Sequence, residues 1–208
     1  MALSKVSVVC LALALFAAAP VWAGPWAESY DAATKTRFIP VELWTGADWD
    51  GTKVIKAGKA DLTFGKRGEK SITGPEPYVR PGTNEQILVY RRENRGREGV
   101  KVQLFTISSN RDGIGRVYDS RYDRNCADEV KFPLGLWKQG ETRTFEVRCG
   151  EKVRRIELTI EDIDYVLGGV PHALRYRWVV DDGRQKGTDN TYVYSPRQGN
   201  IEVVEHVK

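Results

Sequence analysis

Three residues between positions 161 and 172 have side chains that are suited to acid–base chemistry. Asp162 and Asp164 stand two positions apart in a run that alternates as a β-strand does, so both carboxyl groups face one side, about 7 Å apart. Glycosidases use carboxyl pairs at such separations. His172 follows the loop 168–171, and a hairpin would return it beside either carboxylate, as a general base requires. This neighbourhood is the basis of an alternative function, a hydrolase acting on an envelope polymer; the simpler interpretation is a solvated strand tip and a surface-loop histidine.

A second set of residues is suited to binding an anion. The segment Arg116–Arg124 is predicted as one strand, on which alternation puts Arg116, Tyr118, Tyr122 and Arg124 on a single face. Tyrosine rings stack on sugars, and guanidinium groups form paired hydrogen bonds to anions. In the opposing interpretation both tyrosines face the core and the arginines flank them at the rim of the sheet. These four residues are the candidate ligand-binding surface.

Motifs for metal, phosphate and nucleophilic chemistry are missing from the sequence. Residues 48–51 resemble the opening of a calcium loop, but Lys59 occupies the twelfth position, where an EF-hand needs Glu. A β-turn is the simpler interpretation. Only two histidines are present, on separate segments, and no G-x-S-x-G elbow or phosphate-binding glycine loop occurs. We therefore expect no metal and no cofactor.

The first 23 residues have the pattern of a secretory signal peptide. An apolar run over residues 6–23 follows Lys5 and ends in Val21–Trp22–Ala23, a small-x-small cleavage pattern. We expect cleavage after Ala23, a periplasmic or secreted protein, and no stable membrane span afterwards. An uncleaved membrane anchor is the alternative, since the 18 residues of the run just reach across a bilayer. Residues 24–208 are predicted to form one domain, because no linker or repeat divides them.

Two cysteines, Cys126 and Cys149, remain after removal of the signal segment that carries Cys10. In an oxidising compartment a disulfide between them is the expected state. They bracket two strand-like runs, Glu129–Trp137 and Thr142–Val147, which predict a hairpin with the sulfurs near its open base. Closing such a loop stabilises a protein by about 3 kcal/mol in the chain-entropy account.

The mature chain alternates apolar and polar residues with period two nearly throughout. Short runs of this kind, separated by Asn, Asp and Gly turns, indicate an all-β fold: a single-domain antiparallel β-sandwich, Ig-like or jelly-roll-like, with a barrel as the alternative. Ile39, Val41 and Leu43 alternate along one predicted strand, and the only helix candidate is 28–36. The predicted core includes Val102, Leu104, Ile156, Leu158, Ile160, Tyr176 and Trp178.

Composition and charge favour recognition over catalysis. The chain has 41% hydrophobic and 29% charged residues, an ordinary globular composition that excludes disorder. Its net charge of +4 is too even for a dedicated nucleic-acid binder. We therefore expect an exported noncatalytic binding or accessory protein of the cell envelope, whose ligand is an anionic glycan or another protein. A hydrolase acting through Asp162, Asp164 and His172 is the first alternative, and a structural or inhibitor-like partner protein is the second.

Overall fold

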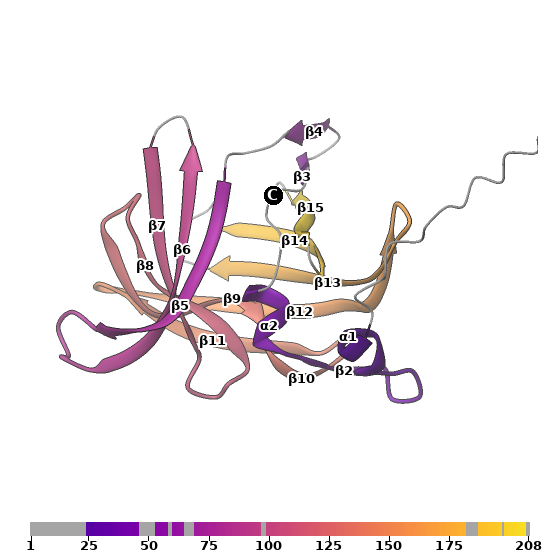
Figure 1. The fold of residues 1–208 in the computed structure, drawn as a ribbon, viewed down its shortest axis with the longest axis horizontal. Coiled ribbons are helices and arrows are strands. Elements are labelled where there is room, and N and C mark those ends of the chain that lie inside the picture. The colour runs from indigo at the N-terminus through magenta and orange to yellow at the C-terminus, as the bar shows by residue number, and fades with distance from the viewer. Residues whose placement is uncertain are drawn as a thin grey trace, which may run out of the picture.

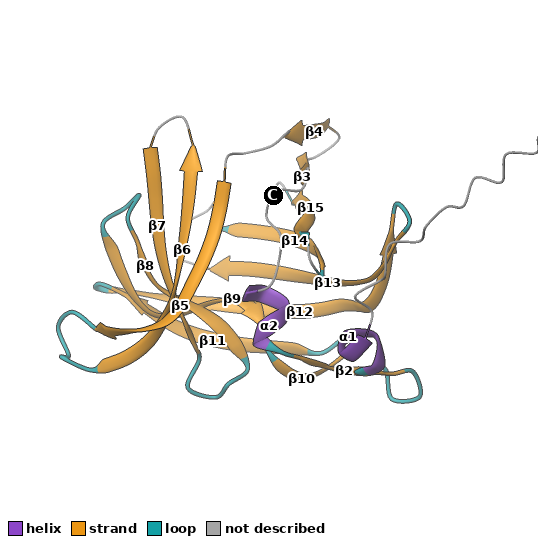
Figure 2. Ribbon diagram, viewed as in Figure 1, coloured by secondary structure: helices purple, strands orange, loops and turns teal. Residues whose placement is uncertain are grey.

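The computed structural model describes residues 24–45, 53–57, 60–64, 69–96, 99–181, 187–196 and 198–206. Within these ranges the chain forms two short helices, α1 (Gly24–Glu28) and α2 (Val41–Thr45), and is otherwise dominated by strands (Figure 2). The expected signal segment 1–23 and the expected turn at 48–51 lie outside the described residues.

The strands belong to three sheets, and all neighbours pair antiparallel except β15 and β3, which are parallel. The smallest sheet has the order β1 (Tyr30–Asp31), β2 (Thr36–Ile39), β10 (Gly135–Lys138). The five-stranded sheet runs β5 (Glu69–Val79), β6 (Gln86–Gly96), β7 (Gly99–Ile107), β8 (Gly113–Asp119), β9 (Arg124–Pro133). The seven-stranded sheet runs β11 (Thr142–Cys149), β12 (Lys152–Leu167), β13 (Val170–Asp181), β14 (Thr188–Ser195), β15 (Gly199–Glu205), β3 (Lys53–Ala57), β4 (Ala60–Phe64). The all-β prediction is confirmed, and none of the sheets formed by the described residues closes into a barrel.

The main core lies where the two large sheets face each other. In Figure 1, strands β6–β8 stand at a steep angle to β13 and β14. Alternation along β12 and β13 turns every second side chain inward, as the sequence predicts. Five of the predicted core residues are buried there: Ile156, Leu158, Ile160, Tyr176 and Trp178. Leu104 is buried in a smaller cluster with Val89 and Val117, and Val102 packs against that cluster while only partly buried.

The segment that contains Val41 and Leu43 is a helix, so its assignment to a strand is wrong. Pro40 precedes the helix, where its fixed φ and missing N–H do no harm, and its carbonyl accepts a hydrogen bond from the Leu43 amide at 3.2 Å. Leu43 and its neighbour Trp44 are both buried. Two consecutive inward side chains suit a helix and conflict with a strand.

The disulfide between Cys126 and Cys149 is present, but the local hairpin expected between them is wrong. Strand β10 pairs with β2, so that Leu136 lies opposite Phe38, and β11 pairs with β12. The disulfide therefore joins β9, an edge strand of the five-stranded sheet, to β11, an edge strand of the seven-stranded sheet. It closes the seam between the two large sheets.

Replacing Leu158 by alanine tests the core. Leu158 is 0% exposed, so Leu158→Ala should lower the free energy of unfolding by about 2–5 kcal/mol through lost burial and a residual cavity. Leu136→Ala is the matched control, because Leu136 is 60% exposed and its loss should cost less than about 0.5 kcal/mol. Denaturant titration measures both, and equal losses would mean that the inward face is misassigned.

Candidate functional site

A cavity of about 120 Å³, partly open to solvent, lies between the inner faces of the two large sheets. A closed apolar cavity of about 150 Å³ accepts benzene, so this smaller space suits a single ring only because its open side lets part of the ligand extend into solvent. Its lining combines aromatic side chains with three cations. The lining residues are Trp44, Arg92, Phe105, Arg116, Lys131, Phe132, Tyr176, Trp178, Tyr192, Tyr194 and Asn200.

Several aromatic residues that line the cavity pack against one another. Phe132 contacts Tyr176 edge-on with centroids 5.8 Å apart and Tyr194 at 4.6 Å, while Tyr176 stacks on Tyr192 at 5.3 Å. Burial raises the pKa of Tyr176, Tyr192 and Tyr194, so these phenols stay neutral at physiological pH. The Trp178 indole donates to the Val130 carbonyl at 2.8 Å. These aromatic residues offer a fixed, uncharged surface on which a ring can stack.

Two cations of the cavity, Lys131 and Arg116, are held in position by ion pairs with carboxylates. The Lys131 ammonium lies 3.5 Å from the centre of the Trp178 ring and donates to Glu129 at 3.1 Å. Arg116 donates to Glu129 through Nε at 2.9 Å and to Asp119 through Nη1 at 2.6 Å. Paired contacts of this kind fix a guanidinium group in one orientation. Both cations therefore present their charge in a defined place.

Arg92 is the third cation of the cavity. Its guanidinium group lies 4.7 Å from the centre of the Phe105 ring, and its Nε donates to Gln103 at 3.1 Å. Burial, and to a smaller extent the positive charge of Arg116, lower the pKa of Arg92 to about 10. Burial likewise lowers the pKa of Lys131 well below its usual value, against the attraction of Glu129. An anion placed beside these groups would stabilise their charged forms.

The two carboxylates are ionised despite their burial. Burial alone raises the pKa of Glu129, but the charges of Lys131 and Arg116 outweigh it and hold that pKa below its usual value. Burial also raises the pKa of Asp119, and hydrogen bonds from Arg121 and Gln103 outweigh it and hold the pKa far below the usual range. Both groups are therefore negative charges that pair with the cations of the cavity.

The predicted strand Arg116–Arg124 is wrong, because β8 ends at Asp119 and β9 begins at Arg124. Of the four predicted binding residues, Arg116 lines the cavity. Tyr118 instead packs against the smaller hydrophobic cluster. Tyr122 lies in the intervening turn with 63% of its surface exposed, and Arg124 lies 5.7 Å from its ring. The four side chains do not share one strand face.

Sequence reasoning missed Arg92 and Lys131. A usable signal existed for Arg92, which stands two residues after Tyr90 and so must point inward with it. Arg154 stands two residues before buried Ile156 in the same way. A charge at an inward position of an alternating strand lowers stability unless it is paired and hydrogen-bonded, so such a residue marks a candidate site.

The Asp162, Asp164 and His172 neighbourhood lies at the hairpin of β12 and β13. His172 Nδ1 lies 2.8 Å from Asp164 Oδ1, as the sequence suggested. Asp162, however, accepts from the backbone amide of Asp164 at 2.9 Å, within an irregular stretch of β12, so the two carboxyl groups do not form a facing pair on a regular strand.

Asp164 also fastens the N-terminal arm to this hairpin. Arg37 is fully buried and donates to Asp164 at 2.9 Å and to the Ile163 carbonyl at 2.7 Å. The Trp26 ring lies 4.3 Å from the Arg37 guanidinium group, and its indole donates to the His172 carbonyl at 2.8 Å. Burial raises the pKa of Asp164, but hydrogen bonds from His172 and Arg37 outweigh it and lower that pKa. The cluster ties α1 and β2 to the β12–β13 hairpin.

Cys126, Glu129 and Cys149 are the one group of potential metal ligands found in the described ranges, with ligand atoms within 4.8 Å of one another. The two sulfurs are bonded to each other, and the Glu129 carboxylate already faces Arg116 and Lys131. A disulfide is a poor ligand, and cations surround the only carboxylate. The arrangement suits structural support of the seam.

Comparisons with protein-family models, with curated proteins and with solved structures find no match. Across the described ranges, no helix has the length and apolar character needed to cross a membrane. The chemistry of the cavity must therefore be argued from its own residues.

Lys131→Met should make the protein more stable at neutral pH, by about 1 kcal/mol, because the desolvation of the partly buried ammonium outweighs its attraction to Glu129 and is lost when an apolar chain of similar length replaces it. Glu129 keeps Arg116 and Arg154 as partners in this variant. The pKa of Lys131 is lower in the folded state than its usual 10.5, so the unfolded chain binds more protons. The stability difference should therefore shrink as pH rises toward 10.5.

Denaturant titration at pH values from 7 upward measures the effect. A variant that is less stable than the parent at pH 7 would show that the contact of Lys131 with Glu129 outweighs the cost of burial.

Proposed function

We propose that this chain is an exported, noncatalytic binding protein that holds an anionic ligand with a ring-sized body in the cavity between its large sheets. The observation that carries the proposal is the lining, in which Arg92, Arg116 and Lys131 stand among packed aromatic rings. Anionic sugars and small aromatic acids both combine a negative charge with a ring whose apolar face can stack on aromatic side chains. The cavity has room for one such unit, which suits the charged unit of a glycan better than a folded partner protein.

The energetics of the cavity support binding. Keeping cations in a half-enclosed space costs stability, and proteins retain such costs mainly at functional sites. An incoming anion offsets this cost, because charge-assisted hydrogen bonds are stronger than neutral ones. Rings already locked by packing lose little conformational freedom when a ligand stacks on them.

Export and the finer architecture are parts of the same proposal. The Cys126–Cys149 disulfide is typical of oxidising compartments and supports a periplasmic or secreted location, with removal of residues 1–23. We propose further that the two large sheets act as the layers of a sandwich-like trough. Their strands mostly follow sequence order, as in a meander, whereas Ig-like and jelly-roll sandwiches use Greek-key connections.

Binding can be measured by tryptophan fluorescence, because Trp44 and Trp178 line the cavity. Two pairs of ligands differ mainly in charge: glucuronate against glucose, and benzoate against benzyl alcohol. The charged member of at least one pair should bind, and Lys131→Met should weaken its binding about tenfold or more, as expected for the loss of a charge-assisted hydrogen bond.

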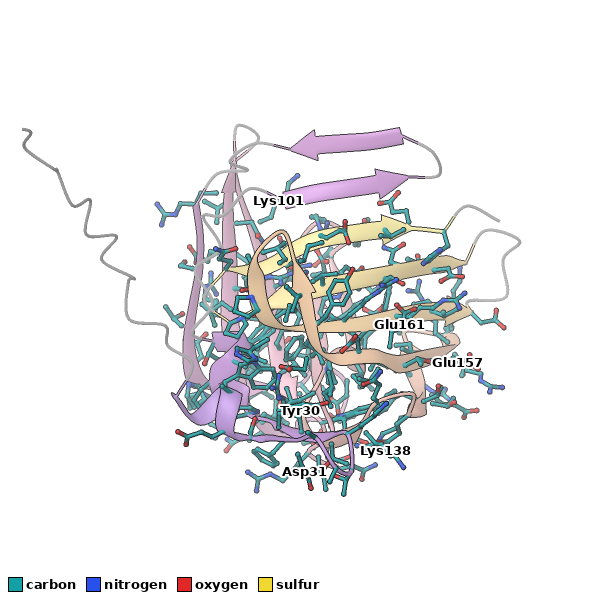
Figure 3. All side chains as sticks on the ribbon, turned by 90° about the vertical axis from the view of Figure 1, so that its right-hand side faces the viewer. Tyr30, Asp31, Lys101, Lys138, Glu157 and Glu161 are labelled. Carbon is teal, nitrogen blue, oxygen red and sulfur yellow. A yellow bond between two sulfur atoms is a disulfide. The ribbon has the colours of Figure 1, made fainter. Side chains whose placement is uncertain are left out.

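Lys138→Met is the matched control, because Lys138 is exposed at the end of β10, in the same small sheet as Asp31 (Figure 3), and does not line the cavity. Its affinity should equal that of the parent. Equal binding of charged and neutral members, or unchanged binding by Lys131→Met, contradicts the proposal.

A hydrolase acting on an envelope polymer is the second candidate, and the 2.8 Å contact between His172 and Asp164 favours it. If His172 acts as a general base, His172→Gln should abolish release of reducing ends from an anionic glycan and leave the free energy of unfolding nearly unchanged. A tie between the N-terminal arm and the hairpin predicts the reverse: no turnover in the parent and a loss of stability in the variant.

A further inference from the structure

Glu129 and Asp119, which are ion-paired to the cations of the cavity, together contact more cations than they can neutralise. The side chains of Glu129 and Asp119 are only 1% and 2% exposed. Their ion-pair partners come from three strands and one turn: Arg116, Arg121, Lys131 and Arg154. The local charge is therefore positive even with every ion pair formed.

Arg124 adds a fifth cation at the start of β9. Burial lowers the pKa of Arg124, and the positive charge of nearby Arg154 lowers it further. In the part of the chain that the structure describes, the Nε atoms of Arg124 and Arg154 are buried and have no hydrogen-bond partner. The group thus holds both surplus positive charge and donors that lack an acceptor.

A ligand that relieves this surplus needs more than one negative charge and several acceptor atoms. A carboxylate supplies one charge and two oxygens. A phosphomonoester supplies about −1.5 to −2 charges near pH 7 and three acceptor oxygens. Guanidinium groups pair with phosphate through two parallel hydrogen bonds, and an ammonium group binds it as a point charge.

We infer that the cavity takes a phosphomonoester carried on a ring-sized body, with the phosphate against Arg116 and Lys131 and the ring against aromatic residues of the lining. This inference rests on the proposed function and narrows its ligand class from anions in general to phosphate esters. The ring belongs either to a sugar or to an aromatic compound, since both stack on aromatic side chains.

The test compares ligands that share a ring and differ in the anion: glucose 1-phosphate against glucuronate, and phenyl phosphate against benzoate. At pH 7.5 the phosphate ester should bind at least about tenfold more tightly than its carboxylate counterpart in one pair, and that pair identifies the ring. Lowering the pH to 5 should weaken the phosphate ester several-fold, because its second pKa is about 6, while the carboxylate stays ionised. Inorganic phosphate alone should bind more weakly than the better ester.

Arg124→Met tests whether the surplus of positive charge sets the preference for phosphate, because Arg124 adds to that surplus without lining the cavity. The buried Nε of Arg124 has no hydrogen-bond partner within the described ranges, so the variant should fold normally and lose several-fold of its preference for phosphate while retaining carboxylate binding. Arg148→Met, an exposed change of the same kind on β11, should keep the full preference. Binding of carboxylates as tight as that of phosphate esters overturns this inference and leaves the proposed function standing. Binding of neither class to the parent overturns the proposed function itself.

Discussion

Glu129 is the carboxylate on which the cavity depends. It is almost fully buried on β9 and pairs with Arg116 from β8, Lys131 from its own strand and Arg154 from β12. A lone carboxylate in this position would cost several kcal/mol of stability, and each donor reduces that cost. Because its partners come from both large sheets, Glu129 fixes the charges of the two sheets relative to each other beside the disulfide that closes the same seam.

Period-two alternation predicted the fold class and most of the core, because a strand with one apolar face alternates apolar and polar residues along the sequence. Ile156, Leu158 and Ile160 are buried as that alternation requires. It failed at Val41–Thr45, where alternation on a short run resembles a strand although two adjacent side chains turn inward. It also failed at β10, because the pairing partner of that strand is β2, far upstream, and local turn residues carry no information about a distant strand.

The site was predictable only in part. Arg116 was identified, but the turn at 120–123, where Asp123 takes a positive φ of 43°, ends the strand that was to place it with Tyr122 and Arg124. The aromatic residues of the cavity come from α2, β7, β9, β13 and β14, so no local sequence pattern could predict that they lie together. The inward charges Arg92 and Arg154 were the readable clue, because alternation places them inside before any topology is known.

The hydroxyl of Tyr194 sets an order in which the chain becomes structured. It donates to the Leu43 and Trp44 carbonyls at the end of α2, and a helix of only five residues has little stability without such a partner. Tyr194 follows Trp44 by 150 residues, so the ribosome makes the helix long before it makes its cap. This contact of the helix can therefore form only after β14 has been made.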